Sequence, residues 1–158
     1  MRFENPELDK ELDELPVEEA QEFGRRAAVA ALAPLVWQLA VGDRWDVRHA
    51  AEFLGVSRQA LYKRLAAGTA LGVAGRGTTW FPTWQFDRDQ QIVRAVTAQV
   101  VAAFREADPL IESEVIAAWA MHTNSLLGQR TPADWIIGGG SDEAVVTAAR
   151  RAAAGLAA

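Results

Sequence analysis

The sequence predicts a mainly α protein in which a helix-turn-helix and a small β-hairpin precede a helical C-terminal module. Two short stretches with helical spacing of apolar residues flank the corner formed by residues 55–57. An apolar run and a β-branched, aromatic run then flank a glycine-rich turn at residues 75–77. Long segments with apolar residues at helical spacing lie on both sides of this central region.

The helix-turn-helix is expected at residues 47–65. Apolar residues at helical spacing (Val47, Ala50, Ala51 and Leu54) define the inward face of its first helix. Gly55 suits the left-handed conformation at a helix end, and Ser57 suits the N-cap of the next helix. The second helix, residues 58–65, is expected to bury Ala60, Leu61 and Leu65 and to expose Arg58, Gln59, Tyr62, Lys63 and Arg64.

A β-hairpin is expected directly after these helices. Residues 71–74 form a short apolar run, and residues 78–81 form a β-branched and aromatic return strand. Gly75-Arg76-Gly77 forms the turn and places one cation at its tip. Pro82 should end the second strand, while Trp84 and Phe86 should anchor the hairpin to the helices.

The order of helices, basic-tipped hairpin and aromatic anchor resembles the winged helix-turn-helix of MerR-type and excisionase-type proteins. The segments that carry the resemblance are LGVSRQALYKRL and FPTWQF. It implies binding to double-stranded DNA through base-reading and phosphate-holding side chains. The expected DNA-binding residues are Arg48, Ser57, Arg58, Gln59, Tyr62, Lys63, Arg64, Arg76 and Thr78. The alternative is that the helix-turn-helix serves only as a stable packing of two helices.

The charge distribution supports DNA binding by this region. The chain carries a formal charge of −5, which disfavours a general nucleic-acid coat protein. Residues 1–42 carry −5 and residues 87–158 carry −3, whereas residues 43–86 carry +3. Positive charge confined to one segment is expected when a single face meets phosphate.

The composition suits a globular protein of the reducing cytoplasm. Its 158 residues suffice for one medium domain or two small ones, and half of them are hydrophobic. It has no cysteine, so disulfides and thiolate metal sites are excluded. We expect no signal peptide and no membrane span, because the most apolar segment, residues 27–40, is short and contains Pro34 and Gln38.

The first 42 residues are expected to form an acidic arm and a helix. Residues 1–16 are either a solvated tail or an arm that orders on a partner. Residues 18–41 have helical periodicity, with Pro34 expected to kink or split the helix and Gly42 to end it. The helix is apolar on more than one side, so it either forms a homodimer, with a palindromic DNA site, or packs on its own chain.

Residues 87–158 are expected to form a helical module, the third domain after residues 1–42 and 43–86. Helices are predicted at residues 87–107 and 112–122, with Val115, Ile116, Trp119 and Ala120 of the latter facing inward. A short helix should start at Pro132 behind the N-cap Thr131, and Gly138-Gly139-Gly140 should form a flexible linker after it. A last helix, residues 142–153, should be capped by Ser141 and closed by Gly155.

The segment AWAMHTNSLLGQRTPADWIIGGGSDEAVVTAARR resembles the C-terminal domain of antitoxins of the Xre/MbcA/ParS type. That family places a Trp-ended helix before an Asn-bearing loop and a Gly-Gly-Arg-Thr-Pro-Leu helix start. The matching positions are Trp119, Asn124, Leu127, Gly128, Arg130, Thr131 and Pro132. Gln129 and Ala133 depart from the pattern, and the winged head departs from the family's all-helical DNA-binding domain.

This resemblance implies an antitoxin of a type II toxin-antitoxin system. Such proteins neutralise a RES-type, NAD-consuming toxin and, with it, bind their own promoter. The toxin-binding residues expected from the resemblance are Trp119, Asn124, Arg130, Thr131, Asp134, Trp135, Arg150 and Arg151. Local structural roles for the same residues are the alternative.

No residue pattern predicts an enzyme, a cofactor or a metal site. His49 and His122 lie far apart and lack partners at ligand spacing, and Ser57 lacks the flanking glycines of a nucleophile elbow. The Gly138–Ser141 segment lacks the lysine of a phosphate-binding loop. Besides an antitoxin, the sequence permits a stand-alone regulator or DNA-architectural protein whose C-terminal helices sense a ligand or dimerise. It also permits an interaction protein that does not bind DNA.

Overall fold

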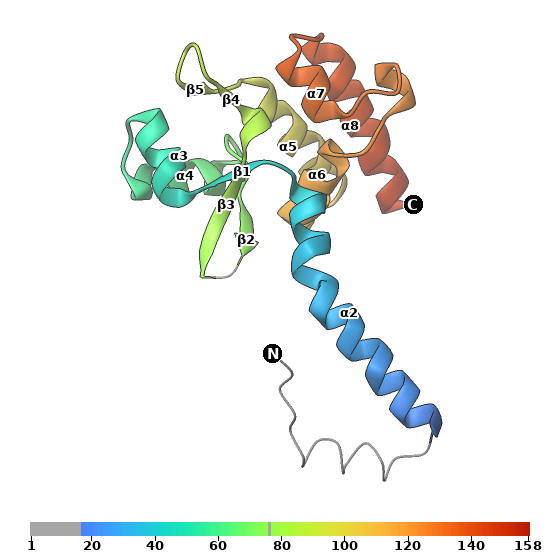
Figure 1. Cartoon of the computed structure of the whole chain (residues 1–158). Coiled ribbons are helices and arrows are strands. Elements are labelled where there is room, and N and C mark those ends of the chain that lie inside the picture. The colour runs from blue at the N-terminus through green and yellow to red at the C-terminus, as the bar shows by residue number, and fades with distance from the viewer. Residues whose placement is uncertain (1–16, 76) are drawn as a thin grey trace. The chain divides into compact units, whose positions relative to one another are not determined.

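The computed structural model describes residues 17–75 and 77–158, which form two units divided between Leu39 and Ala40 (Figure 1). The expected acidic arm, residues 1–16, and the hairpin-tip residue Arg76 lie outside the described residues. The mainly α class with a small antiparallel sheet is confirmed.

The first unit contains most of helix α2 (Val17–Val41). The helix runs through Pro34 as one element, so of the two effects expected of Pro34, a kink or a split, the split does not occur. Glu22 accepts hydrogen bonds from Arg25 and Arg26, and these two guanidinium groups lower the pKa of its carboxyl group. Among apolar residues of α2, Val17 and Phe23 are exposed to solvent.

The predicted helix-turn-helix is confirmed within the second unit. Helix α3 (Val47–Leu54) ends at Gly55, whose φ of +64° is left-handed, and helix α4 (Arg58–Ala67) begins after Ser57. Asp46 caps α3 by accepting a hydrogen bond from the His49 N–H at 2.7 Å. Leu61 of α4 is fully buried, whereas Ala60 and Leu65 are only partly buried.

The predicted hairpin forms strands β2 (Val73–Gly75) and β3 (Thr78–Pro82). A strand that helical periodicity could not reveal, β1 (Arg44–Asp46), pairs antiparallel with β3 and gives the order β1-β3-β2. Trp45 lies opposite Phe81 in this pairing. The segment before α3 therefore ties the helix-turn-helix to the hairpin.

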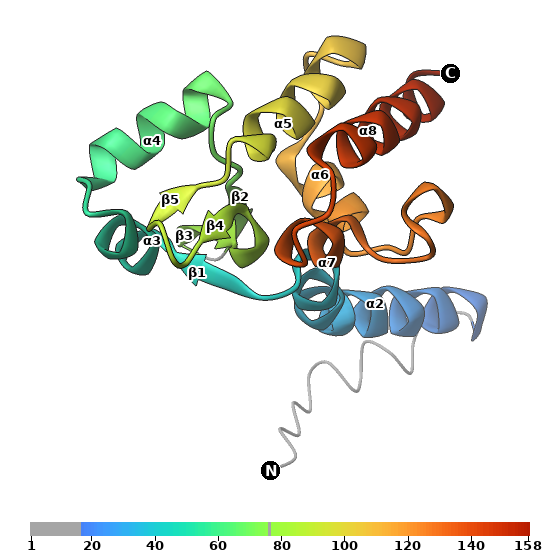
Figure 2. The ribbon, with the colours of Figure 1, turned by 90° about the horizontal axis from the view of Figure 1, so that it is seen from above.

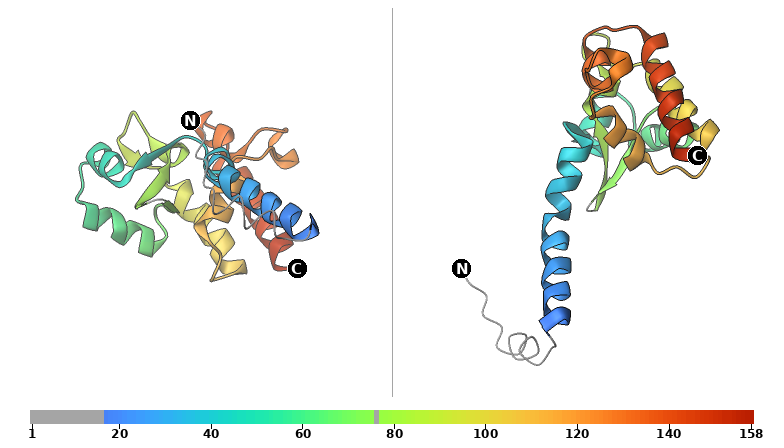
Figure 3. Two further views of the ribbon diagram at one scale, coloured as in Figure 1. Left: turned by 60° about the horizontal axis from the view of Figure 1, so that its bottom comes forward. Right: turned by 90° about the vertical axis from the view of Figure 1, so that its right-hand side faces the viewer.

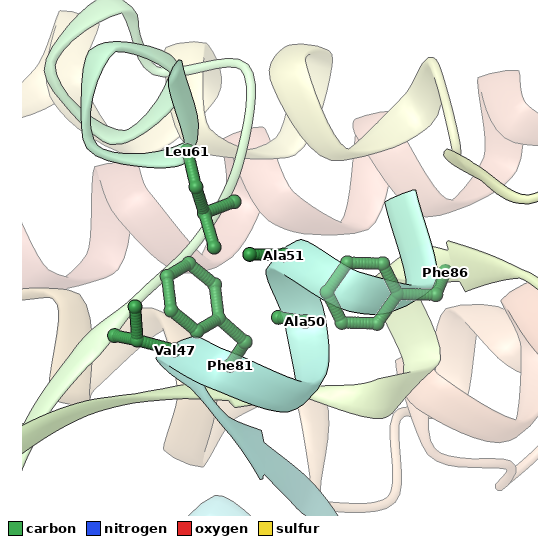
Figure 4. Packing of buried hydrophobic residues seen from close by; sticks show 6 residues of the cluster. All are labelled: Val47, Ala50, Ala51, Leu61, Phe81 and Phe86. Carbon is green, nitrogen blue, oxygen red and sulfur yellow. The ribbon is translucent and has the colours of Figure 1, made fainter. Parts of the chain in front are cut away.

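The two helices and the sheet share one core, shown in Figure 4. Phe81 of β3 lies among Val47 of α3 and Leu61 of α4, and Phe86 packs beside Ala50 on the other side of α3. Trp45 stacks on Phe86 with ring centroids 4.9 Å apart. This packing confirms that Phe86 anchors the hairpin to the helices; Trp84 is also buried.

A buried glutamine holds the base of the hairpin. Gln85 lies in the 3₁₀ helix η1 (Thr83–Gln85) and is fully buried. Its Oε1 accepts a hydrogen bond from the Leu71 N–H at 2.8 Å, and its Nε2 donates to the carbonyls of Leu71 at 2.7 Å and Pro82 at 3.0 Å. The side chain thus satisfies backbone groups where the chain enters the hairpin, at Leu71, and where it leaves, at Pro82.

The helix predicted at residues 87–107 begins later than expected. Strands β4 (Phe86–Asp87) and β5 (Ile92–Val93) form a second hairpin, and helix α5 (Val96–Ala107) follows. Asp87 Oδ1 accepts hydrogen bonds from the N–H groups of Asp89 and Gln90, which fixes a turn where the prediction had a helix. Val93 packs against the aromatic core, so burial favours the hairpin.

The remaining helices are α6 (Ser113–Ala120), the 3₁₀ helix η2 (Ser125–Leu127), α7 (Pro132–Ile137) and α8 (Asp142–Ala157). Helices α5 and α8 lie side by side (Figure 2). Helix α8 continues through Gly155, so the predicted closure there is wrong; the helical bonding of its neighbours outweighs the low helix propensity of one glycine. Val115, expected inward on α6, is exposed.

The turn between α7 and α8 is hydrogen-bonded rather than a flexible linker. The Gly140 N–H donates to the Trp135 carbonyl at 2.9 Å, and the Trp135 indole N–H donates to the Ser141 carbonyl at 3.0 Å. A Cβ atom on Gly140 would collide with the Trp135 ring, so only glycine fits beneath the indole.

Within the second unit, α3 and α4 lie on one side of the three-stranded sheet and α5 to α8 on the other (Figure 1 and Figure 3). The contacts of η1 with α7 and of β2 with α6 join the two sides. Over residues 17–75 and 77–158, no helix combines the length and apolarity that crossing a bilayer requires.

Replacing Gln85 with Ala is expected to lower the free energy of unfolding by about 3 kcal/mol, because three buried backbone groups lose their partner and a void forms. Gln99→Ala, an exposed substitution on α5, should change it by less than about 0.5 kcal/mol. Denaturant titration of both variants measures the difference. Equal stabilities of Gln85→Ala and the parent chain would contradict the role assigned to this side chain.

Candidate nucleic-acid interface

The solvent face of α4 carries polar side chains that the rest of the described chain leaves unengaged. Arg58, Gln59, Tyr62 and Lys63 are all exposed. Their side chains form no hydrogen bond or ion pair with any residue in the described ranges. They are therefore available to base edges or phosphates, whereas Arg64 is half-buried.

Ser57, another expected DNA-binding residue, has a structural role. Its Oγ accepts a hydrogen bond from the Ala60 N–H at 3.1 Å and thereby caps α4. Its side chain fixes where the helix begins, which in turn sets the direction of the exposed α4 residues.

Three expected DNA-binding residues from three different elements line one hollow of about 290 Å³. Arg48 comes from α3, Arg58 from the start of α4 and Thr78 from β3. The hollow also contains Asp46 and Trp80. Arg48 already pairs with Glu52 at 3.2 Å across an exposed surface, so this ion pair is weak and its guanidinium can exchange partners.

Two further arginines of the head were not identified from the sequence. Arg44 lies 5.2 Å from the ring centre of Trp80, and Arg88 lies 5.7 Å from that of Trp45. Arg44 belongs to β1, which no periodicity revealed, and Arg88 lies in the turn between β4 and β5, where a helix was expected. Both therefore add positive charge near the helix-turn-helix core.

Most of the residues that the antitoxin resemblance singled out form contacts within the loop before α7. Trp119 is half-buried and packs edge-on against Phe104 at 5.3 Å between ring centres. Asn124 accepts a hydrogen bond from the Leu126 N–H, and its backbone pairs with that of Arg130. These contacts close the loop locally.

The start of α7 confirms the predicted helix signals. Thr131 Oγ1 accepts a hydrogen bond from the Asp134 N–H at 3.1 Å, with Pro132 at the first helical position. Arg130 donates to the Asp134 carbonyl at 2.8 Å and lies over the Trp135 ring. Most of the pattern residues are thus occupied by contacts within the module.

Arg150 and Arg151 differ from the rest of the pattern because both are exposed on α8. They lie about two turns before the end of α8 at Ala157. Ala153 beyond them is buried, and the exposed residues 154–157 continue the helix.

In the described parts of the chain, no three histidine, aspartate or glutamate side chains are grouped as a metal site requires.

Residues 43–68 match the family model of the bacterial regulatory protein, Fis family, a helix-turn-helix model. The match covers β1, α3, α4 and the Gly68 cap, the segment whose geometry is described above. Neither a curated protein nor a solved structure matches the chain significantly. The chain therefore carries a helix-turn-helix head of the DNA-binding type.

Proposed function

We propose that this protein is a transcription regulator that binds specific double-stranded DNA, including its own promoter, with α4 as the reading helix. The observation that carries the proposal is the unengaged polar face of α4 within a head that matches a DNA-binding family. The net positive charge of residues 43–86 in an acidic chain also supports it. A regulator of this kind acts in the cytoplasm.

The expected docking places α4 in the major groove. Near the start of the helix, Arg58 and Gln59 are suited to guanine and adenine edges, respectively. Lys63, one turn further on, is suited to a phosphate. Arg48 and Thr78 line the adjacent hollow, and the hairpin tip with Arg76 is expected to follow the DNA backbone.

Lys63→Ala should weaken binding to all DNA sequences alike and reduce the salt dependence by about one unit of slope, because one phosphate contact is lost. Gln59→Ala should cost about 1–3 kcal/mol on the preferred site only, because a base contact is lost. Fluorescence anisotropy with promoter DNA and unrelated DNA over a salt series measures both effects.

The matched control is Arg150→Ala, which removes one exposed positive charge from α8 and should leave DNA affinity unchanged. Unchanged binding after the double reversal Arg58→Glu, Lys63→Glu would refute α4 as the reading helix.

We also propose that the C-terminal module binds and neutralises a partner toxin of the RES type, making the protein an antitoxin. The support is the resemblance over residues 118–151 together with exposed side chains on α8. Because loop contacts occupy Asn124, Arg130 and Thr131, the binding surface is assigned mainly to Arg150, Arg151 and the exposed Leu156. The alternative is a stand-alone regulator, which the DNA-binding head supports equally well.

The double variant Arg150→Glu, Arg151→Glu in the full chain should abolish co-purification with the product of an adjacent toxin-sized gene. It should leave promoter binding by the head intact, because the substituted residues lie outside it. Growth rescue on co-expression is the second readout. Arg105→Glu, a single reversal on α5, and the α4 double reversal serve as controls that should retain the partner.

Full retention of the partner by the Arg150→Glu, Arg151→Glu variant would remove α8 from the interface. If no neighbouring product is toxic or co-purifies, the stand-alone regulator takes the place of the antitoxin.

We further propose a homodimer formed through α2, supported by the exposed apolar residues Val17, Phe23 and Leu39. Phe23→Glu should shift sedimentation equilibrium from two chains to one at micromolar concentration, because a charge in an apolar interface is desolvated. Gln21→Glu adds the same charge at another exposed position and should retain the dimer. A parent chain that sediments as one chain at every concentration excludes the proposal.

A further inference from the structure

Trp80 presents aromatic surface at the hollow of about 290 Å³ beside α4, outside the core of the helix-turn-helix. It lies in β3 opposite Asp46 of β1. The next residue, Phe81, is fully buried in the core, whereas Trp80 is half-buried and lines the hollow. Successive side chains of a strand point to opposite faces, so the tryptophan is directed away from the core. Part of its ring therefore stays accessible to a partner.

The hollow lies where three parts of the head meet. Arg48 comes from the first turn of α3, Arg58 is the first residue of α4, and Thr78 is the first residue of β3. In helix-turn-helix proteins the start of the second helix contacts base edges, while the first helix crosses the DNA backbone. A hollow bounded by the starts of both helices therefore adjoins the backbone when Arg58 reaches a base.

Arg48 and Thr78 supply the hollow with groups that suit a phosphate. Arg48 pairs with Glu52 at 3.2 Å on an exposed surface, where such ion pairs are weak. The Thr78 hydroxyl lies 3.5 Å from the Thr79 carbonyl oxygen, which is the long limit of a hydrogen bond. Both side chains can exchange these contacts for a phosphate oxygen.

Asp46 is the acidic member of the six lining residues. Its Oδ1 accepts a hydrogen bond from the His49 N–H at 2.7 Å and so caps α3. The carboxylate still carries a negative charge, which opposes a phosphate nearby. With Arg48 and Arg58 also in the lining, the sum of formal charges stays positive.

The ring of Trp80 suits the sugar that adjoins such a phosphate. Deoxyribose offers C–H groups, and the indole offers a flat apolar surface. The guanidinium carbon of Arg44 lies 5.2 Å from the ring centre and adds positive charge beside it. Each phosphate of a DNA strand is bonded to two sugars, so a phosphate at Arg48 and Thr78 brings a sugar to the same hollow.

We infer that Trp80 contacts a deoxyribose of the DNA strand whose phosphate is held by Arg48 and Thr78. The inference rests on the proposed docking of α4 in the major groove. A sugar contact positions the duplex without reading a base, so Trp80 adds affinity for all DNA sequences alike. A base stacked on Trp80 would have to leave the duplex at a cost in stacking energy, whereas the sugar is accessible on the intact duplex.

Nuclear Overhauser spectroscopy of the full chain bound to a promoter duplex tests the contact directly. Cross-peaks are expected between the indole protons of Trp80 and deoxyribose protons. Trp80→Phe removes the indole signals and thereby assigns them. Trp119, a half-buried tryptophan of the C-terminal module, is the internal control and should show no cross-peak to DNA.

Trp80→Ala should weaken binding to promoter and unrelated DNA about tenfold, as expected when about 50 Å² of apolar contact is lost. The slope of the salt dependence should not change, because no charge is removed, whereas Arg48→Ala should lower it by about one unit. Trp80→Phe keeps an aromatic ring and should lose less affinity than Trp80→Ala. Trp119→Phe, the matched control, should leave DNA affinity unchanged.

Thermal unfolding measures whether each variant folds. If Trp80→Ala unfolds, the Overhauser measurement on the parent chain and the affinity of Trp80→Phe decide.

Asp46→Asn keeps an N-cap acceptor and removes the negative charge of the hollow. It should strengthen binding to all DNA sequences about two- to fivefold, the range expected for one exposed charge pair. Glu112→Gln removes the same charge from an exposed position in the C-terminal module and should have no effect. Equal affinities of Asp46→Asn and the parent chain would place the phosphate outside the hollow and overturn the inference.

The inference is also overturned if the parent chain binds the promoter duplex without a cross-peak from Trp80 to deoxyribose, or if Trp80→Ala folds and binds as the parent does. Cross-peaks to base protons alone would place Trp80 in a groove and overturn it as well. In each of these cases DNA binding through α4 stands. A parent chain without affinity for DNA would instead refute the proposed function, and the inference with it.

Discussion

The buried side chain of Gln85 holds together the segments that enter and leave the hairpin of the helix-turn-helix head. The chain passes from α4 into the hairpin at Leu71 and leaves it at Pro82, the last residue of β3, which lies opposite Arg44 of β1. One amide side chain supplies an acceptor for the Leu71 N–H and donors for both carbonyls. Since the partners are one N–H and two C=O groups, they also fix the orientation of the amide. The hairpin, and with it Thr78 beside α4, is placed by this network.

The aromatic core beside this network leaves α4 free to bind a ligand on its outer face. Leu61 alone among the α4 side chains is fully buried, and Phe81 and Phe86 supply the bulk of the apolar volume. Because the core fully buries only Leu61 of α4, positions such as Gln59 and Lys63 can carry polar side chains. The aromatic residues of β3 and of the segment after η1 therefore supply the core, which leaves the outer face of α4 polar.

In the C-terminal module, in contrast to α4, several polar side chains form hydrogen bonds within the module. Asn124, Arg130 and Thr131 form hydrogen bonds within their own loop, and Trp135 covers Gly140 and binds the Ser141 carbonyl. A residue pattern that resembles that of a family can thus specify how a loop folds, whereas Arg150 on α8 is exposed. A pocket lies between this module and the head. Its lining residues range from Asp43 to Ile137, about 90 positions apart in the sequence.

Local signals in the sequence predict several of the elements correctly. The helix-turn-helix with its Gly55 end and Ser57 cap, the hairpin around residues 75–77 and the start of α7 at Thr131 and Pro132 all depend on contacts within a few residues. The other elements depend on contacts between residues that are distant in the sequence. Strand β1 exists because Trp45 pairs opposite Phe81, and Phe86 and Val93 form a hairpin because the aromatic core buries them, despite a helical spacing in the sequence. The contacts of Gln85 and the pocket between the modules join residues distant in the chain, so no local pattern could reveal them.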